Sequence, residues 1–316
     1  VMTRRFLVGV DNSQNTLQAL TNLGNLLLDT DVHFHLFHAV PESSLLYPGE
    51  LSTLSGEPSD WEKVQRRQAE KVLDQAMGAL VELGYKRSRL HPQSKLQSVS
   101  TAQDILEASE NADSGAIVLA RKGHSAVKRF LLGSTTASVC QYAEAQPVWA
   151  IGPPALRAPR ILAALDESDY AIRVVTHLAE TLGPVPGTRV NLLHVIPAKP
   201  PGYWDNGHIL DEMERSEREA LVRRWRSLHE DKMADVFSQA RKSLMSAGIG
   251  DDRITSGTRP RVRGIARDII AEANRGNYNI LAFGRRGTSG IREFNLGSRA
   301  SKILQSTPEC TLIVVN

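Results

Sequence analysis

The sequence predicts two tandem α/β domains, each a doubly wound parallel sheet of the Rossmann-like class. The chain has 316 residues, about twice the usual length of one domain. It contains an internal repeat, offset by 155 residues from Asp11 to Asp166. Within each repeat, short apolar runs alternate with helical patterns, as in buried parallel strands joined by helices. We expect domains at residues 1–152 and 160–316, with a linker rich in proline at 153–159.

Each repeat opens with an apolar strand that ends in Asp-x-Ser. Residues 6–10 precede Asp11, and residues 161–165 precede Asp166. Apolar side chains then recur at spacings of three, three and four, which is one face of a helix. They are Leu17, Leu20, Leu23 and Leu27 in the first repeat, and Ile172, Val175, Leu178 and Leu182 in the second. The serine of the motif is well placed to cap this helix.

The middle and end of each repeat follow the same order. A second apolar run, 34–41 or 190–197, ends in His-x-x-Pro, and a long charged helical pattern follows, roughly at 60–83 or 211–247. The last apolar runs are residues 148–151 and 312–315. Each would be an exposed hydrophobic edge by itself. We therefore expect the two repeats to pair through these last strands as an internal pseudo-dimer, and a homodimer of the whole chain is left open.

Glycines follow the next-to-last strand of each repeat. The second repeat has Gly284 and Gly287, then nine residues, then Gly297-Ser298, whereas the first repeat begins the same pattern with Ala120. This is neither a Rossmann GxGxxG nor a P-loop. Glycines admit close backbone approach and positive φ, and a helix N-terminus attracts anions. These strand ends also meet at the crevice where open α/β sheets bind ligands, so the pattern predicts a phosphate site.

The chain resembles a tandem universal stress protein over essentially its whole length, because that family has the ATP-binding pattern G-x2-G-x9-G-(S/T). The resemblance implies ATP, with or without Mg²⁺. The strand-one aspartate would meet the adenine end, the residue after the strand-two histidine would pack on the base, and the glycine segment would hold ribose and phosphates. The implied contacts are Asp166, Val195, Gly284, Arg286, Gly287, Gly297, Ser298 and Arg299, with Asp11, Ala39, Gly123, Gly133 and Ser134 in the first repeat.

Two departures from the family pattern matter. Arg299 follows Gly297-Ser298 where a small apolar residue is common, and it would either aid or crowd the phosphates. Ala120 replaces the first glycine of the first repeat, where a methyl group would cost close contact and disfavour positive φ. We expect ATP in the second repeat and weaker or no binding in the first.

Other candidate residues have simpler interpretations. His38 and His194 are expected to be satisfied core histidines, since no second ligand stands at metal-binding spacing from them. Ser134 and Ser298 lack a GxSxG elbow and a His/Asp partner, so no catalytic residue is expected. Aromatic residues of the middle segments would be packing residues or would line an apolar pocket. They are Trp61, Tyr203, Trp204 and Trp225. Arg285 is a further candidate phosphate donor beside Arg286.

Composition excludes several classes of function. A net charge of +3 is too small to favour nucleic acid or anionic membranes. No apolar stretch approaches the roughly 18 residues of a membrane span. Two cysteines without ligand spacing suggest reduced thiols and a cytoplasmic protein. The leading hypothesis is an ATP-binding stress-response regulator. The alternatives are a slow ATPase or phosphotransferase, and a scaffold that binds a small apolar ligand.

Overall fold

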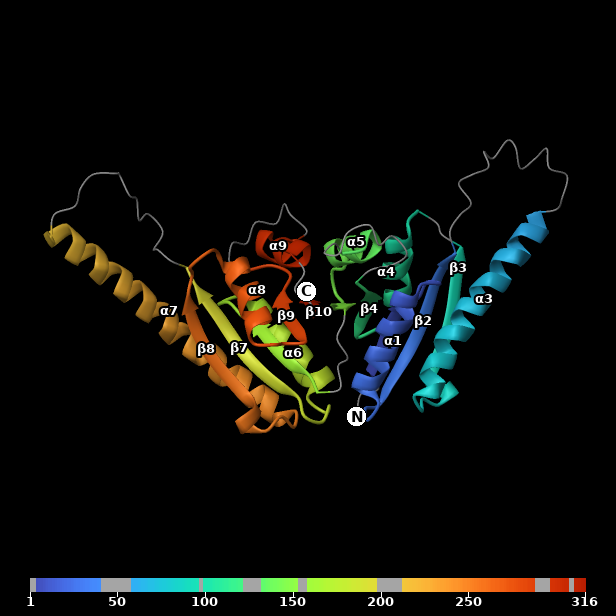
Figure 1. The fold of residues 1–316 in the computed structure, drawn as a ribbon, viewed down its shortest axis with the longest axis horizontal. Helices are drawn as coiled ribbons and strands as arrows, with labels where there is room; N and C mark the ends of the chain where they lie inside the picture. The colour runs from blue at the N-terminus through green and yellow to red at the C-terminus, as the bar shows by residue number, and fades with distance from the viewer. Residues whose placement is uncertain are drawn as a thin grey trace. The chain divides into compact units, whose positions relative to one another are not determined.

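Both repeats form parallel sheets covered by helices, as the sequence predicts (Figure 1). The computed structural model describes residues 4–40, 58–96, 99–121, 132–152, 158–197, 212–287, 296–306 and 310–316. Contacts divide the chain into two compact units. One contains the residues up to Ala158 together with most of the C-terminal strand, and the other begins at Pro159.

The first unit has strand order β3-β2-β1-β4-β5, with all four pairings parallel. Its strands are β1 Arg4–Gly9, β2 Val32–Val40, β3 Leu90–Leu96, β4 Ala116–Ala120 and β5 Val148–Ile151. Its helices are α1 Gln14–Leu27, α3 Pro58–Glu82, α4 Thr101–Asn111 and α5 Ser134–Tyr142, with a 3-10 turn at Arg87–Arg89. Helix α1 packs beside α3 and α4 beside α5. Right-handed crossovers place these pairs on opposite faces of the sheet.

Strand β10, Thr311–Val315, pairs antiparallel with β5 and belongs by its contacts to the same unit. Ile313 faces Trp149 in this register, and both side chains are fully buried. Trp149 also meets Phe6 edge-on, with ring centroids 5.5 Å apart. The last strands of the two repeats therefore pair with each other, which covers both apolar edges.

The second unit has strand order β9-β6-β7-β8, also parallel. Its strands are β6 Arg160–Ala164, β7 Arg189–Ile196, β8 Ile254–Pro260 and β9 Ile280–Gly284. Its helices are α6 Asp169–Leu182, α7 Glu212–Ser246, α8 Ile265–Arg275 and α9 Ser298–Ser306, with a 3-10 turn at Asp251–Arg253. Helix α6 packs beside α7 and α8 beside α9. Among the described helices, none combines the length and hydropathy needed to cross a membrane.

The sequence predicts that the buried face of α6 begins at Ile172, and this prediction is wrong. Ile172 is 56% exposed, and Ala171 and Val174 are buried instead. Each residue advances about 100° around a helix, so the buried face that runs through Val175 and Leu178 passes position 171 rather than 172.

Candidate functional site

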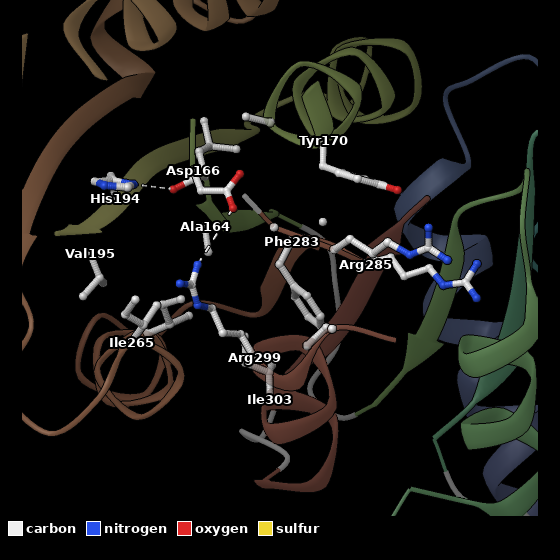
Figure 2. A pocket seen from close by; sticks show the side chains of 18 of the residues that line it. Ala164, Asp166, Tyr170, His194, Val195, Ile265, Phe283, Arg285, Arg299 and Ile303 are labelled. Atoms are coloured by element: carbon white, nitrogen blue, oxygen red, sulfur yellow. Dashed lines mark hydrogen bonds and ion pairs between the residues drawn. The ribbon is translucent and has the colours of Figure 1, made fainter. Parts of the chain in front are cut away.

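The second unit has a pocket where its strand order reverses, between β6 and β9 (Figure 2). Asp166 follows β6, Val195 lies on β7, Gly284 ends β9, and Ser298 begins α9. Open α/β sheets bind ligands in this crevice. The structure brings the residues named for the second repeat around this one pocket: Asp166, Val195, Gly284, Arg286, Gly287, Gly297, Ser298 and Arg299.

The Asp166 carboxylate is held at both oxygens. Its Oδ1 accepts a hydrogen bond from the Ser168 backbone N–H at 3.0 Å and another from the Ser168 hydroxyl. Arg299 Nη1 lies 4.0 Å from Oδ2, and Figure 2 shows the arginine reaching toward the aspartate across the pocket. The space left has a volume of about 80 Å³. Arg299 therefore crowds the pocket in this structure, through a long, partly exposed ion pair of the kind worth only about 0–1 kcal/mol.

Glycine is needed in this pattern because a side chain would clash with neighbouring atoms, and not because the backbone has positive φ. The expectation that Ala120 disfavours a positive φ in the first repeat is therefore wrong for the equivalent position, Gly284. None of Gly284, Gly287 and Gly297 has positive φ. A Cβ at Gly284 would lie 2.7 Å from the Tyr170 Cβ, and one at Gly297 would lie 3.0 Å from the Arg285 carbonyl oxygen. A Cβ at Gly287 would lie 2.7 Å from Asp166 Oδ2, inside the pocket.

The two arginines between the first glycines differ in exposure. Arg285 is only 4% exposed, whereas Arg286 is half-buried. At the equivalent place in the first repeat, Arg121 is also buried and donates from Nη1 to the Cys310 carbonyl oxygen at 3.0 Å. Arg286 is thus the better placed of the pair to meet a ligand.

The first unit has an equivalent but larger pocket of about 560 Å³. It is lined by the first-repeat candidates Asp11, Ala39, Gly133 and Ser134, together with His38 and Ala120. Gly123 lies outside the described residues. Three hydrogen bonds converge on Asp11 Oδ1, from the Ser13 backbone and hydroxyl and the Thr16 hydroxyl. Thr135 stands where the second repeat has Arg299, so no arginine crosses this pocket from that position.

The two motif serines differ in how they begin their helices. Ser13 caps α1 by accepting from the Thr16 backbone N–H at 3.2 Å, as predicted. Ser168 occupies the same place before α6, but its hydroxyl accepts no such bond, because the Ala171 backbone N–H donates to the Ser168 carbonyl oxygen instead, at 3.0 Å. Ser134 and Ser298 are the first residues of α5 and α9.

A polar cluster beside the second pocket was not foreseen from the sequence. The Nδ1–H of His38 donates to the Val10 carbonyl oxygen at 2.8 Å, and the Nδ1–H of His194 donates to the Leu165 carbonyl oxygen at the same distance. The Nε2 of His194, however, is buried without a partner among the described residues. His229 of α7 and Glu167 lie beside it. Spacing in sequence does not reveal this cluster, because its members lie far apart in the chain.

The aromatic residues of the middle segments are described only in part. The Trp225 Nε1–H donates to the Pro197 carbonyl at 3.3 Å, and the indole ring meets His229 edge-on. Trp225 is thus a packing residue of α7. Tyr203, Trp204 and the side chain of Trp61 lie outside the described residues.

Comparison with solved structures gives the fold class of the whole chain. A universal stress protein from Archaeoglobus fulgidus DSM 4304 aligns with a TM-score of 0.65 and 18% identity, over 100% of this chain and 99% of that one. A functionally unknown protein from Pseudomonas aeruginosa PAO1 aligns with a TM-score of 0.57 and 16% identity, over 99% and 92%. A search of curated sequences found no match. These likenesses define a tandem α/β protein of the Rossmann-like class.

The universal stress protein family profile matches twice, over residues 2–151 and 158–316. The chain therefore belongs to the universal stress protein family, with two such domains in tandem.

Proposed function

We propose that the second repeat binds ATP and that nucleotide occupancy sets the conformation of the protein or its affinity for a partner. The observation that carries this proposal is the meeting of Asp166 with the complete G-x2-G-x9-G-S pattern around one pocket at the strand ends. Helix α9 begins at Ser298, beside this pocket. The free backbone N–H groups and the dipole at a helix N-terminus favour the binding of phosphate. A magnesium ion would arrive with the triphosphate and keep several of its waters.

Nucleotide entry requires the Arg299 side chain to leave Asp166. The side chain of Arg299 is 44% exposed and its ion pair with Asp166 is long, so rotation toward solvent or toward a phosphate costs little. After that rotation, the guanidinium group stands at the start of α9, where it would meet an anion. The Arg299 side chain thus lies across the pocket when it pairs with Asp166, and it would contact the phosphates after rotation.

The test is mass spectrometry of small molecules released by denaturing the full-length protein as purified. We expect an adenine nucleotide at up to one per chain, reduced by the substitution Asp166→Ala. Protein that binds no adenine nucleotide, either as purified or after incubation with ATP, would overturn the proposal.

A second ligand in the first repeat is favoured by its cavity. Its volume of about 560 Å³ lies within the roughly 300–1,000 Å³ of small-molecule sites, and Phe37, Val72 and Ile105 are among its apolar lining residues. This observation supports the alternative of a small apolar ligand for that repeat. The same mass spectra would show such a ligand as a species that persists in the Asp166→Ala protein.

A further inference from the structure

A cluster of metal-binding side chains lies beside the nucleotide pocket of the second repeat. Glu167 follows β6, His194 lies on β7, and His229 lies on α7. One potential ligand atom from each lies within 4.8 Å of the other two. His194 and His229 are buried, and the Glu167 side chain is 21% exposed. Three elements thus converge on one small volume with two imidazoles and a carboxylate.

His194 is oriented as a metal-ligating histidine usually is. Its Nδ1 lies 2.8 Å from the Leu165 carbonyl oxygen, which only accepts, so Nδ1 carries the proton and Nε2 carries the lone pair. That Nε2 is buried and has no partner among the described residues. Burial lowers the pKa of His194, which favours the neutral ring. Histidine ligands typically donate their other ring N–H to a carbonyl or carboxylate, which fixes the tautomer.

His229 is the second imidazole of the cluster. Its Nδ1 contacts Glu167 Oε1, and its Nε2 is buried without a partner in the described part of the chain. The ring is held from one side by Trp225, with centroids 4.3 Å apart, and it stacks toward His194 at 6.2 Å. The packed position of this ring makes it a preoriented ligand rather than a mobile surface group.

Glu167 is kept ionised at this site. Burial opposes its ionisation, but hydrogen bonds from Lys232 and His229 outweigh burial and lower its pKa. Lys232 Nζ lies 3.2 Å from Oε2 and supplies one positive charge. A divalent cation would supply two, and it would displace the exposed ammonium group to solvent.

We propose that Glu167, His194 and His229 bind a divalent transition-metal ion of the zinc type, with a fourth position open to water. Two imidazole nitrogens and one carboxylate oxygen suit zinc and its neighbours, whereas Mg²⁺ prefers oxygen ligands alone. The site is distinct from the place of a nucleotide-borne Mg²⁺. Glu167 and His194 adjoin Asp166 and Val195, whereas phosphates would lie at Gly297 and Ser298.

The first repeat provides a comparison within the same chain. Asn12 stands in place of Glu167 at the offset of the opening strand and helix, and His38 stands in place of His194 as the histidine of the His-x-x-Pro motif. Gln65 stands in place of His229 at the offset of the long helices, and it lines the first pocket together with His38. The histidine on the strand is retained and the two other ligands are replaced by amides. The proposal therefore predicts one metal ion per chain.

The test is a titration of metal-stripped full-length protein with Zn²⁺ by calorimetry, with Co²⁺ absorption as an independent probe of geometry. Wild-type protein should bind one ion and give the visible bands of four-coordinate Co²⁺. The variants His229→Gln, which copies the first repeat, and Glu167→Gln should lose at least tenfold in affinity. Lys232→Met should gain affinity, because it removes the competing ammonium group. A purely structural role for the cluster would not produce that gain.

The control is His91→Gln. His91 Nε2 lies 3.0 Å from His33 Nδ1, and its ring stacks on His35, so this variant removes a histidine from a separate histidine cluster of the described chain. Binding should survive in this variant. Wild-type protein that binds no stoichiometric zinc would overturn the proposal. So would equal affinity in well-folded Glu167→Gln protein, or loss of binding in His91→Gln alone.

Discussion

Gly287 is the glycine at which an added methyl group would meet Asp166 inside the pocket of the second repeat. A methyl group there would lie 2.7 Å from Asp166 Oδ2, closer than real Cβ contacts allow. The aspartate or the glycine loop must then shift. Gly287 and Asp166 are far apart in the sequence, and this close approach places them in one site.

The substitution Gly287→Ala should weaken ATP binding by roughly tenfold or more, which is about 1.4 kcal/mol. The matched control is Gly257→Ala in β8, where nothing lies within 4 Å of the added Cβ. Calorimetric titration of both proteins with ATP checks this. Equal affinity in the two variants would show that Gly287 does not face the nucleotide.

His177 gives the second unit a dependence on pH. It is buried in α6, and burial lowers its pKa from the ordinary 6.5 to about 3. The unfolded chain then binds a proton that the folded chain does not, so stability is complete above pH 6.5 and falls as the pH drops toward 3.

We expect wild-type protein to lose about 2 kcal/mol of unfolding free energy from this group between pH 7 and pH 5. His177→Asn should remove that loss, since the first repeat has a buried Asn22 at the equivalent position. Denaturant unfolding of both proteins at the two pH values is the measurement. Identical pH dependence in the two proteins would contradict the assignment.

The residues of the glycine pattern could be grouped from the sequence because the pattern begins at the end of one strand, Asp166 follows another, and parallel strands end at one edge. The backbone conformations of these glycines could not be predicted from the sequence. The absence of a side chain prevents clashes with neighbouring atoms, and none of the described glycines of the second pattern has positive φ. The ion pair of Arg299 with Asp166 and the place of His229 depend on side-chain direction and on helix rotation, which a motif does not encode.

Among the secondary-structure elements, the buried central strands could be predicted from the sequence and the edge strands could not. Residues 6–9 of β1, residues 161–164 of β6, and all of β4 and β9 are continuous apolar runs because both faces are covered. β3 and β8 read Leu-His-Pro-Gln-Ser-Lys-Leu and Ile-Thr-Ser-Gly-Thr-Arg-Pro, with mostly exposed side chains. Each pairs with a strand on one side only among the described strands, which tolerates proline and polar residues. Periodicity therefore gave no signal for them.

Strand β10 is expected to stabilise the first unit. Leu312, Ile313 and Val314 are fully buried, and they pair with β5. Removing residues 309–316 should cost several kcal/mol, at about 1.5–3 kcal/mol for each buried side chain, and should expose the β5 edge to self-association.

Thermal unfolding and sedimentation velocity of the truncated chain check this expectation. A lower melting temperature together with dimers or larger species is the expected result. A truncated chain that stays monomeric with the melting temperature of the full-length protein would contradict the role given to β10.

At the scale of the whole molecule, the two repeats share a fold and differ in their sites. The second has the complete glycine pattern and a pocket crossed by Arg299, and the first has Ala120 and a wide cavity. Duplicated domains can keep one architecture while their sites diverge, because function resides in the site rather than in the fold.

Bound ATP should turn over slowly. Fast phosphoryl transfer needs a group that orients the attacking water, and no residue with that role accompanies the glycine pattern among the described residues around the pocket. Groups that bind ground state and transition state equally give affinity without rate. We expect single-turnover phosphate release far below the roughly 1–10³ s⁻¹ of ordinary enzymes. A rate in that range that is abolished by Asp166→Ala would favour the ATPase alternative.

We expect ATP to occupy the second repeat in preference to the first. Calorimetric titration of the full-length chain with ATP and magnesium, in wild-type, Asp166→Ala and Asp11→Ala proteins, tests it most directly. The wild-type protein should have one tight site, which should be at least tenfold weaker in Asp166→Ala and unchanged in Asp11→Ala. Binding that is lost in Asp11→Ala and retained in Asp166→Ala would contradict it.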